Sequence, residues 1–311
     1  MRTRASLFCS LLLIVYLLVS GTLVLAASDD AKYGQSWLDV DYVGDGIIGH
    51  RLDIYLPASG SGPFPVLVGI YGSAWARDDK KGPTGAMSAP VWCPLGFAVV
   101  AINHRSSLDV TFPAQIHDAK AAIRFLRANA ETYHLDSDRI GVSGASSGGH
   151  LASLLGTSGD VGEHTFRDVT VNLEGTLGDH LDVSSRVQAV SNISGTVNFL
   201  TLSSCGSTYD HDAPDSNASR FIGGPLQESA ELCTLASPIT YVDEDDPPFR
   251  IFHGELDTQV PHCQSAALQF ALLRAGVPSE YTLVEGAGHG DMNTLAIAVA
   301  LIEFFQGVLM P

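Results

Sequence analysis

G-V-S-G-A-S-S-G-G-H-L-A-S-L-L-G occupies residues 141–156, and the interpretation of the whole chain begins at this stretch. A short apolar run at residues 139–142 leads into it, and a helical pattern starts at about residue 146. Small residues around a central serine permit the strained strand-to-helix turn that exposes a nucleophilic hydroxyl. The stretch therefore predicts a serine hydrolase, provided that a base and an acid follow along the chain.

Three serines compete for the role of nucleophile. Centring the motif G-x-S-x-G on Ser146 gives a complete match, because glycines stand two residues before and two residues after it. Centring it on Ser147 places Ala145 at the first glycine, and centring it on Ser143 places Ala145 at the second. The Ser147 register fits with alanine at the first glycine and the Ser143 register fails, so the ranking is Ser146, then Ser147, then Ser143.

Short apolar runs alternate with helical patterns along the chain, which is typical of a mostly parallel sheet covered by helices on both faces. The expected strands are residues 38–43, 50–56, 64–71, 97–103, 139–142, 187–193, 249–253 and 279–284, the first two forming an antiparallel hairpin. The expected helices are residues 116–130, one from about 146, 264–275 and 292–305. In the first of these, Lys120, Arg124 and Arg127 are expected to face water. Residues 200–240 are rich in Ser, Asp, Gly and Pro and are expected to form an ordered excursion over the sheet.

A serine hydroxyl becomes a nucleophile only when a base takes its proton, and hydrolases of this kind place an acid and then a histidine after the serine. His289 stands in a Gly-rich loop, residues 286–290, just after the last expected strand. Glu255 and Asp257 follow the preceding strand, and Asp257 is favoured because it stands deeper in the turn. The predicted triad is Ser146, Asp257 and His289.

Other polar residues are given structural interpretations. The acidic run at residues 243–246 is better explained as a solvated loop than as a cation site. The remaining histidines near these motifs are expected to be packed or hydrogen-bonded, or to lie at the surface: His104, His117, His150, His253 and His262.

These motifs also carry a family resemblance. From about residue 39 onward the chain resembles an α/β-hydrolase of the bacterial feruloyl esterase-like branch, related to the hormone-sensitive-lipase type esterases. The segments that carry it are F-P-A-Q-I-H-D-A-K (112–120), D-R-I-G-V (138–142), G-A-S-S-G-G-H-L-A (144–152), I-G-G-P (222–225), A-S-P-I (236–239), D-P-P-F (246–249) and H-G-E-L-D-T-Q-V-P (253–261). The resemblance implies an α/β-hydrolase fold with a mostly parallel eight-stranded sheet, and it assigns the same three triad residues.

The expected oxyanion loop departs from the family pattern. Relatives usually have His-Gly-Gly-Gly/Ala-Trp, whereas residues 71–75 read Y-G-S-A-W. The donors are backbone amides, which we assign to Ser73, Ala74 and Ser147. A non-glycine at Ser73 is expected to resist the torsion angles that such a loop needs, which would leave a slow enzyme.

The first 27 residues predict a secretory signal peptide, since Arg2 and Arg4 precede an apolar run and small residues end at Ala26 and Ala27. The alternative is an uncleaved membrane anchor, because the uncharged run is almost long enough to span a bilayer. We expect cleavage after Ala26 or Ala27, a secreted or periplasmic location, and a single α/β-hydrolase domain over residues 28–311.

Charge and cysteine content restrict the partners. Cleavage would move the formal net charge from −17 to −19, which disfavours nucleic acid and anionic membranes as partners.

Four cysteines would remain after cleavage, in a compartment that permits disulfides: Cys93, Cys205, Cys233 and Cys263. Their spacing matches no metal site. A bridge between Cys205 and Cys233 is one candidate, although spacing does not fix the connectivity.

The expected reaction is two-step hydrolysis of a carboxylic ester of short-chain, acetyl or feruloyl type, free or linked to polysaccharide, without metal or organic cofactor. Residues 201–240, with Phe221 and Leu226, are expected to help wall the pocket, although either side chain can equally pack beneath the loop. Three alternatives remain open: a peptidase of the prolyl-oligopeptidase type, a lipase with a long apolar channel, and a noncatalytic binding protein that kept the fold. The sequence gives no oligomeric state.

Overall fold

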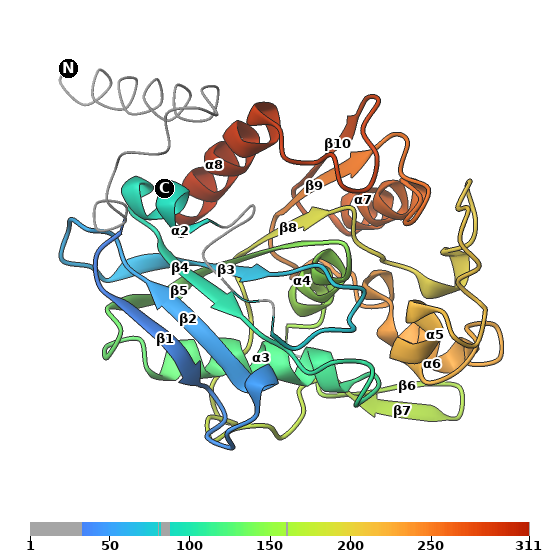
Figure 1. The fold of residues 1–311 in the computed structure, drawn as a ribbon, viewed down its shortest axis with the longest axis horizontal. Coiled ribbons are helices and arrows are strands. Elements are labelled where there is room, and N and C mark those ends of the chain that lie inside the picture. Colours follow the sequence, from blue (N-terminus) through green and yellow to red (C-terminus); the bar gives the residue numbers. More distant parts are fainter. Residues whose placement is uncertain (1–32, 80, 82–87, 160, 311) are drawn as a thin grey trace.

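A computed structural model describes residues 33–79, 81, 88–159 and 161–310, and its centre is an eight-stranded sheet (Figure 1). The main strands are β1 (Ser36–Asp41), β2 (Arg51–Tyr55), β3 (Phe64–Ile70), β4 (Ala98–Ile102), β5 (Leu135–Ala145), β8 (Ala189–Ile193), β9 (Phe249–Gly254) and β10 (Ser279–Val284). They lie in the order β1-β2-β4-β3-β5-β8-β9-β10. The first two pair antiparallel, as predicted, and every pair from β4 to β10 is parallel. The predicted signal peptide lies outside the described residues.

Helices cover both faces of the sheet. They are α2 (Ala89–Trp92), α3 (Ala114–Ala128), α4 (Ser147–Thr157), α5 (Asn217–Ile222), α6 (Ala230–Ala236), α7 (Cys263–Ala275) and α8 (Leu295–Leu309). One apolar core joins α3, α4 and α7 to the sheet, and a second core joins α2 and α8 to its opposite face (Figure 1). The central strands are therefore buried on both sides, which explains why their sequences are continuous apolar runs rather than alternating ones.

A row of small residues crosses the sheet beneath α8. Ala101, Gly69, Ser143 and Ser191 are register partners on β4, β3, β5 and β8. Gly141, two residues earlier on β5 and so on the same face, faces α8, because a Cβ built on it would come within 2.8 Å of Phe305. Small side chains leave space between this part of the sheet and the helix, and the space becomes important at the site.

The prediction that three cations of α3 face water is wrong for two of them. Lys120 and Arg124 are both buried and pair with Glu174, Lys120 at 2.9 Å. Arg127 donates to backbone carbonyls, among them that of Ser137 at 2.9 Å. The polar segment that follows α4 folds over this face of α3 and supplies the carboxylate, and the 3.6-residue periodicity of the helix alone contains no sign of that long-range contact.

Three connections contain elements that the sequence did not reveal, and the first of these elements is α2 between β3 and β4. The segment after α4 includes a separate hairpin, β6 (Glu163–Phe166) and β7 (Val169–Asn172). The excursion over residues 200–240 includes α5 and α6. Phe221 and Leu226 are buried in the main core, so they pack beneath the excursion instead of walling a cavity.

The disulfide connects Cys205 to Cys263, and Cys233 is free. The candidate pairing of Cys205 with Cys233 is therefore wrong. Cys233 lies on the buried face of α6, where its thiol donates to the carbonyl of Leu226 at 3.3 Å. The bridge instead joins the excursion to the first residue of α7.

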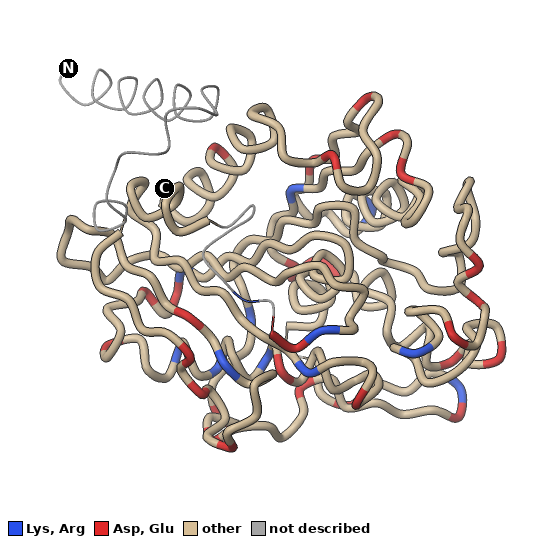
Figure 2. The backbone as a smooth tube through the Cα atoms, viewed as in Figure 1, with Lys and Arg blue, Asp and Glu red and all other residues tan. Residues whose placement is uncertain are grey.

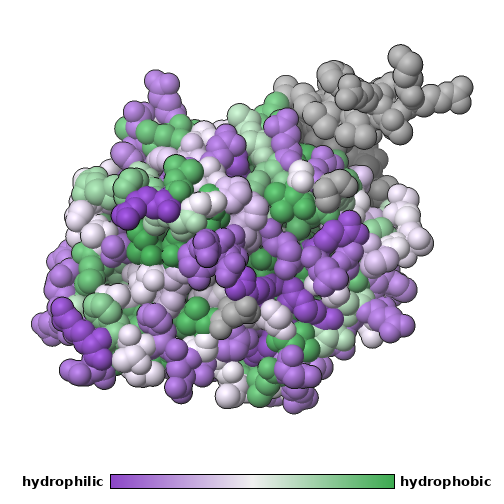
Figure 3. Space-filling model, turned by 180° about the vertical axis from the view of Figure 1, so that it is seen from behind, coloured by the Kyte–Doolittle hydropathy of each residue, from purple (hydrophilic) through white to green (hydrophobic). Residues whose placement is uncertain are grey.

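Charge and hydropathy are distributed without a single dominant patch on the faces drawn. Acidic residues lie on loops around the molecule with fewer basic residues among them, and α8 carries little charge (Figure 2). From behind, hydrophilic and hydrophobic side chains are interspersed (Figure 3). Within the described ranges, helices of the length and apolarity needed to cross a membrane are absent.

Candidate active site

Ser146 lies on a sharp turn between β5 and α4. Its backbone torsions are φ 55° and ψ −125°, a strained conformation for a residue with a side chain. The turn is closed by glycines, since a Cβ on Gly144 would come within 2.1 Å of the carbonyl oxygen of Gly148. The amide of Ser146 donates to the carbonyl of Ile193 at 2.8 Å. These contacts hold the hydroxyl of Ser146 above the carboxyl edge of the sheet.

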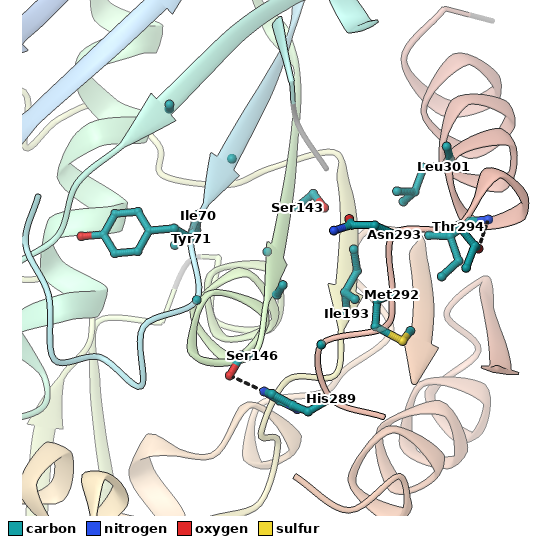
Figure 4. A pocket seen from close by; sticks show the side chains of 18 of the residues that line it. Ile70, Tyr71, Ser143, Ser146, Ile193, His289, Met292, Asn293, Thr294 and Leu301 are labelled. Atoms are coloured by element: carbon teal, nitrogen blue, oxygen red, sulfur yellow. Dashed lines mark hydrogen bonds between the residues drawn. The ribbon is translucent and has the colours of Figure 1, made fainter. Parts of the chain in front are cut away.

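The three residues of the predicted triad lie in a hydrogen-bonded chain. His289 Nε2 is 2.9 Å from Ser146 Oγ, and His289 Nδ1 is 2.6 Å from Asp257 Oδ2. The carboxylate accepts the proton on Nδ1, which leaves Nε2 as the acceptor for the serine hydroxyl. Figure 4 shows the Ser146–His289 contact where the loop after β10 meets the turn after β5. The structure thus brings together the residues that sequence order selected.

Asp257 is held in its ionised form. Burial alone would raise the pKa of Asp257, but hydrogen bonds from His253 and His289 hold it well below its usual range. The amides of Gln259 and Val260 also donate to Oδ1, each at 3.0 Å. A carboxylate held in this way orients the imidazole of His289. Glu255 is exposed and accepts the amide of a different loop residue.

His253 is a contact of the site that sequence reasoning treated only as structural. It is completely buried, and its Nε2 lies 3.2 Å from Asp257 Oδ2 and 2.7 Å from the carbonyl of Val260. Its Nδ1 lies 2.7 Å from Ser265 Oγ. His253 therefore supports the acid from the side opposite His289. Its position four residues before Asp257 was the available signal.

The expected oxyanion loop has left-handed torsions, but not at Ser73, where strain was expected from the sequence. Ala74 and Trp75 have φ of 51° and 59°, and Ser73 has no positive φ. The strain expected at Ser73 therefore falls on Ala74 and Trp75. The amide of Ser73 donates to Ser147 Oγ at 2.9 Å. Ser147 is the first residue of α4, where a backbone N–H has no intrahelical acceptor.

Two aromatic residues fix the ends of this loop. The ring of Tyr71, which replaces the usual histidine, stacks on His104 with centroids 4.9 Å apart, and its hydroxyl donates to the carbonyl of Arg77. Trp75 is buried and its indole N–H donates to His150 Nδ1 at 3.0 Å. Burial lowers the pKa of His150 to about 4, so this histidine is a neutral structural residue, as predicted.

A large cavity opens beside Ser146, and we call it the inner cavity. It has a volume of about 750 Å³ and runs between the sheet and the start of α8 (Figure 4). The small residues Gly69, Ala101 and Ser143 form its floor. Its other walls include Trp92, Ile193, Met292, Asn293, Leu301 and Ile302. Ser143, the serine ranked last as nucleophile, lines the cavity, and its buried hydroxyl has no hydrogen-bond partner in the described structure.

A second, smaller cavity of about 250 Å³ also borders Ser146, and we call it the rim pocket. Ala74, Ser146, Ser147 and His289 contribute to its base, and residues 209–218 of the excursion form its outer wall. The excursion therefore does line a pocket, as expected, although through residues other than Phe221 and Leu226.

The described residues contain no cluster of three or more His, Cys, Asp or Glu side chains suited to a metal ion. In the acidic run at residues 243–246, Asp243, Glu244 and Asp245 are exposed and Asp246 is partly buried, and the amide of Asp245 donates to Asp243.

The chain is similar to known esterases in sequence and in fold. The BD-FAE family model matches residues 52–272. Esterase LipQ of Mycobacterium tuberculosis is 31% identical over 250 residues, which cover 77% of this chain and 54% of LipQ. The chain spans about half the length of the curated relatives that it matches.

Two solved structures are more similar. A truncated carbohydrate esterase from gut microbiota is 38% identical, with a TM-score of 0.84, and the match covers 91% of this chain and 99% of that one. A bifunctional GH43-CE protein of Bacteroides eggerthii is 44% identical, with a TM-score of 0.83 over 88% of this chain and 38% of that one. Both similarities extend over almost all of the described residues.

Proposed function

Because the chain belongs to the BD-FAE family of α/β-hydrolase esterases, we propose that it is a serine esterase that hydrolyses carboxylic esters through Ser146, His289 and Asp257. The observation that carries the proposal is the hydrogen-bonded chain from Ser146 Oγ through His289 to Asp257. Ser146 stands on a strained turn and borders two cavities, which can receive the two halves of an ester.

The geometry supports a two-step reaction. Ser146 Oγ attacks the ester carbonyl while His289 Nε2 takes its proton, and the new C–O bond gives a tetrahedral intermediate. The intermediate expels the alcohol, which receives the proton from Nε2 and leaves an acyl group on Ser146. A water molecule then attacks the acyl group while His289 Nε2 takes its proton. The bond between the acyl carbon and Ser146 Oγ breaks, Nε2 returns the proton to Oγ, and the carboxylic acid leaves. Asp257 keeps the imidazole in the required tautomer throughout.

Backbone amides are the proposed donors to the oxyanion. Of the three assigned from the sequence, the amide of Ser73 is bonded to Ser147 Oγ, so the amides of Ala74 and Ser147 are the proposed pair. Loss of one such donor typically costs about 3 to 4 kcal/mol of transition-state stabilisation. The contact between Ser73 and Ser147 also ties the oxyanion loop to the helix that carries the nucleophile.

The substrate is proposed to be an ester whose acyl group enters the inner cavity. A volume of about 750 Å³ is ample for an acetyl or short-chain acyl group and also accommodates an aromatic group of the feruloyl type. The names of the two similar solved structures support a carbohydrate as the alcohol half. Secretion after cleavage of residues 1–27 belongs to the same proposal and is supported by the N-terminal sequence.

An ester panel tests the function. Initial rates are measured for p-nitrophenyl acetate, p-nitrophenyl decanoate, methyl ferulate, acetylated xylan and acetanilide with the parent chain, Ser146→Ala and Ser59→Ala, an exposed-serine control. We expect hydrolysis of short or aromatic esters that Ser146→Ala abolishes and Ser59→Ala retains. Activity that survives in Ser146→Ala contradicts the mechanism. Cleavage of acetanilide faster than of the esters would indicate a peptidase, and cleavage of the decanoate faster than of the acetate would indicate a lipase. No cleavage of any substrate would indicate a noncatalytic protein.

A further inference from the structure

The rim pocket differs in chemistry from the inner cavity. Its outer wall presents an aromatic ring and several polar side chains within one short segment: Tyr209, Asp210, His211, Asp215, Ser216 and Asn217. Tyr209 is 52% exposed, although it is among the larger apolar side chains of the molecule. The ring stacks on His211 with centroids 6.0 Å apart, and the exposed part of the side chain lines the pocket that Ser146 also borders.

The charges of the rim pocket are of one sign. Among the described residues that line it, the ionised side chains are the carboxylates of Asp210 and Asp215, and its remaining polar groups are amides, hydroxyls and imidazoles. Burial lowers the pKa of His211, which keeps that imidazole neutral. The pocket therefore offers acceptors and neutral groups to a ligand that can donate hydrogen bonds.

The segment that carries Tyr209 is held firmly against the acid loop. The amide of Thr208 donates to the carbonyl of Thr258 at 3.0 Å, and His211 Nε2 donates to the carbonyl of Gln259 at 2.8 Å. The disulfide from Cys205 to Cys263 adds a covalent tie. Thr258 and Gln259 directly follow Asp257 in the chain, so the outer wall of the pocket is anchored to the same loop as the proposed catalytic acid.

We infer that the rim pocket is the subsite for a neutral sugar ring that carries the ester, with Tyr209 as its stacking platform and Asp215 and Asn217 as acceptors for its hydroxyls. This inference rests on the proposed function, because it assigns the alcohol half of the ester to this pocket and the acyl half to the inner cavity. Sugars have apolar C–H faces that lie on aromatic rings and hydroxyls that donate to carboxylates. A uronic acid is disfavoured, because its carboxylate would face Asp210 and Asp215.

Matched acetates test the assignment. We compare kcat/KM for ethyl acetate, O-acetylated methyl xyloside and acetylcholine, which share one acyl group, in the parent, Tyr209→Ala, Tyr209→Phe and Asp215→Asn. Phe270→Ala serves as a control, since Phe270 is an exposed aromatic residue of α7 that does not line the pocket. Tyr209→Ala should lower kcat/KM for the xyloside by about tenfold, as expected for one lost contact, and leave ethyl acetate unchanged. Tyr209→Phe should keep the parent kcat/KM for both ethyl acetate and the xyloside. Asp215→Asn should lower kcat/KM for the xyloside only.

Several outcomes would overturn the assignment. Equal losses on ethyl acetate and the xyloside would show that Tyr209 only supports the fold. An unchanged value for the xyloside would remove Tyr209 from the subsite, and a preference of the parent for acetylcholine would identify a cation subsite instead. Calorimetric titration with xylotriose separates this inference from the proposed function. If the parent hydrolyses no ester but binds xylotriose, and Tyr209→Ala does not bind it, the proposed esterase activity is wrong and the sugar subsite is retained.

Discussion

Replacement of Asp257 by asparagine gives the sharpest quantitative prediction. In the parent, Asp257 Oδ2 lies 2.6 Å from His289 Nδ1, and the carboxylate side chain is completely buried. With an effective dielectric constant of about 20, the attraction between an imidazolium and a carboxylate at this distance is about 6 kcal/mol. This attraction stabilises the imidazolium that forms in the transition state. Its loss in Asp257→Asn corresponds to about a 10⁴-fold loss of kcat. The usual loss for this substitution in Ser-His-Asp hydrolases is of the same order.

The assay is kcat for p-nitrophenyl acetate, with melting temperature as a check that Asp257→Asn remains folded. The matched control is Glu255→Gln, because Glu255 is the other acid in the same turn and does not contact His289. We expect the control to retain full activity. A loss below about tenfold in a folded Asp257→Asn variant, or an equal loss in the control, would refute the electrostatic role assigned to Asp257.

Three further tests concern the stability of the fold. Gly148→Ala places a Cβ within 2.2 Å of a backbone oxygen at the end of β3, so it should lower the free energy of unfolding by about 1 to 3 kcal/mol or more and reduce activity, whereas Gly162→Ala, with nothing within 4 Å, should do neither. Burial raises the pKa of Asp246 to about 7 in the folded protein, whereas the pKa of an aspartate in the unfolded chain is about 4. Because the folded state binds this proton more tightly, the free energy of unfolding falls as pH rises from about 4 to about 7. Asp246→Asn should therefore melt above the parent at pH 8 and close to it at pH 4, and an equal difference at both values would contradict the assignment. Replacing both Cys205 and Cys263 by serine opens a bridge across 58 residues, which should lower the free energy of unfolding by about 4 kcal/mol, and unchanged denaturant unfolding would argue against that bridge.

The sheet was predictable because each central strand is a continuous apolar run bounded by turns. β10 has the predicted bounds, and α7 begins within one residue of its prediction. The local motifs around Ser146 and His289 also indicated which loops meet, because parallel strands bring their carboxyl ends to one edge of the sheet. Sequence order and turn chemistry were therefore enough to select three residues that lie in contact.

Contacts that depend on long-range folding were not predictable. Glu174 pairs with both Lys120 and Arg124 from a segment about 50 residues further along the chain, which no periodicity of α3 reveals. The partner of Cys205 depends on where the excursion folds back onto α7. The oxyanion loop illustrates the same limit. A family pattern placed the strain at Ser73, but the positive φ angles occur at Ala74 and Trp75, and the Ser73 amide instead donates to Ser147 Oγ.

The identity of the nucleophile is the central claim, and covalent labelling tests it most directly. The intact chain is treated with a fluorophosphonate, digested, and the fragment that contains Ser143, Ser146 and Ser147 is sequenced by tandem mass spectrometry. We predict one phosphonyl adduct per chain, located on Ser146, and none in Ser146→Ala. An adduct on Ser147, or a native chain that takes up no label, would contradict the account.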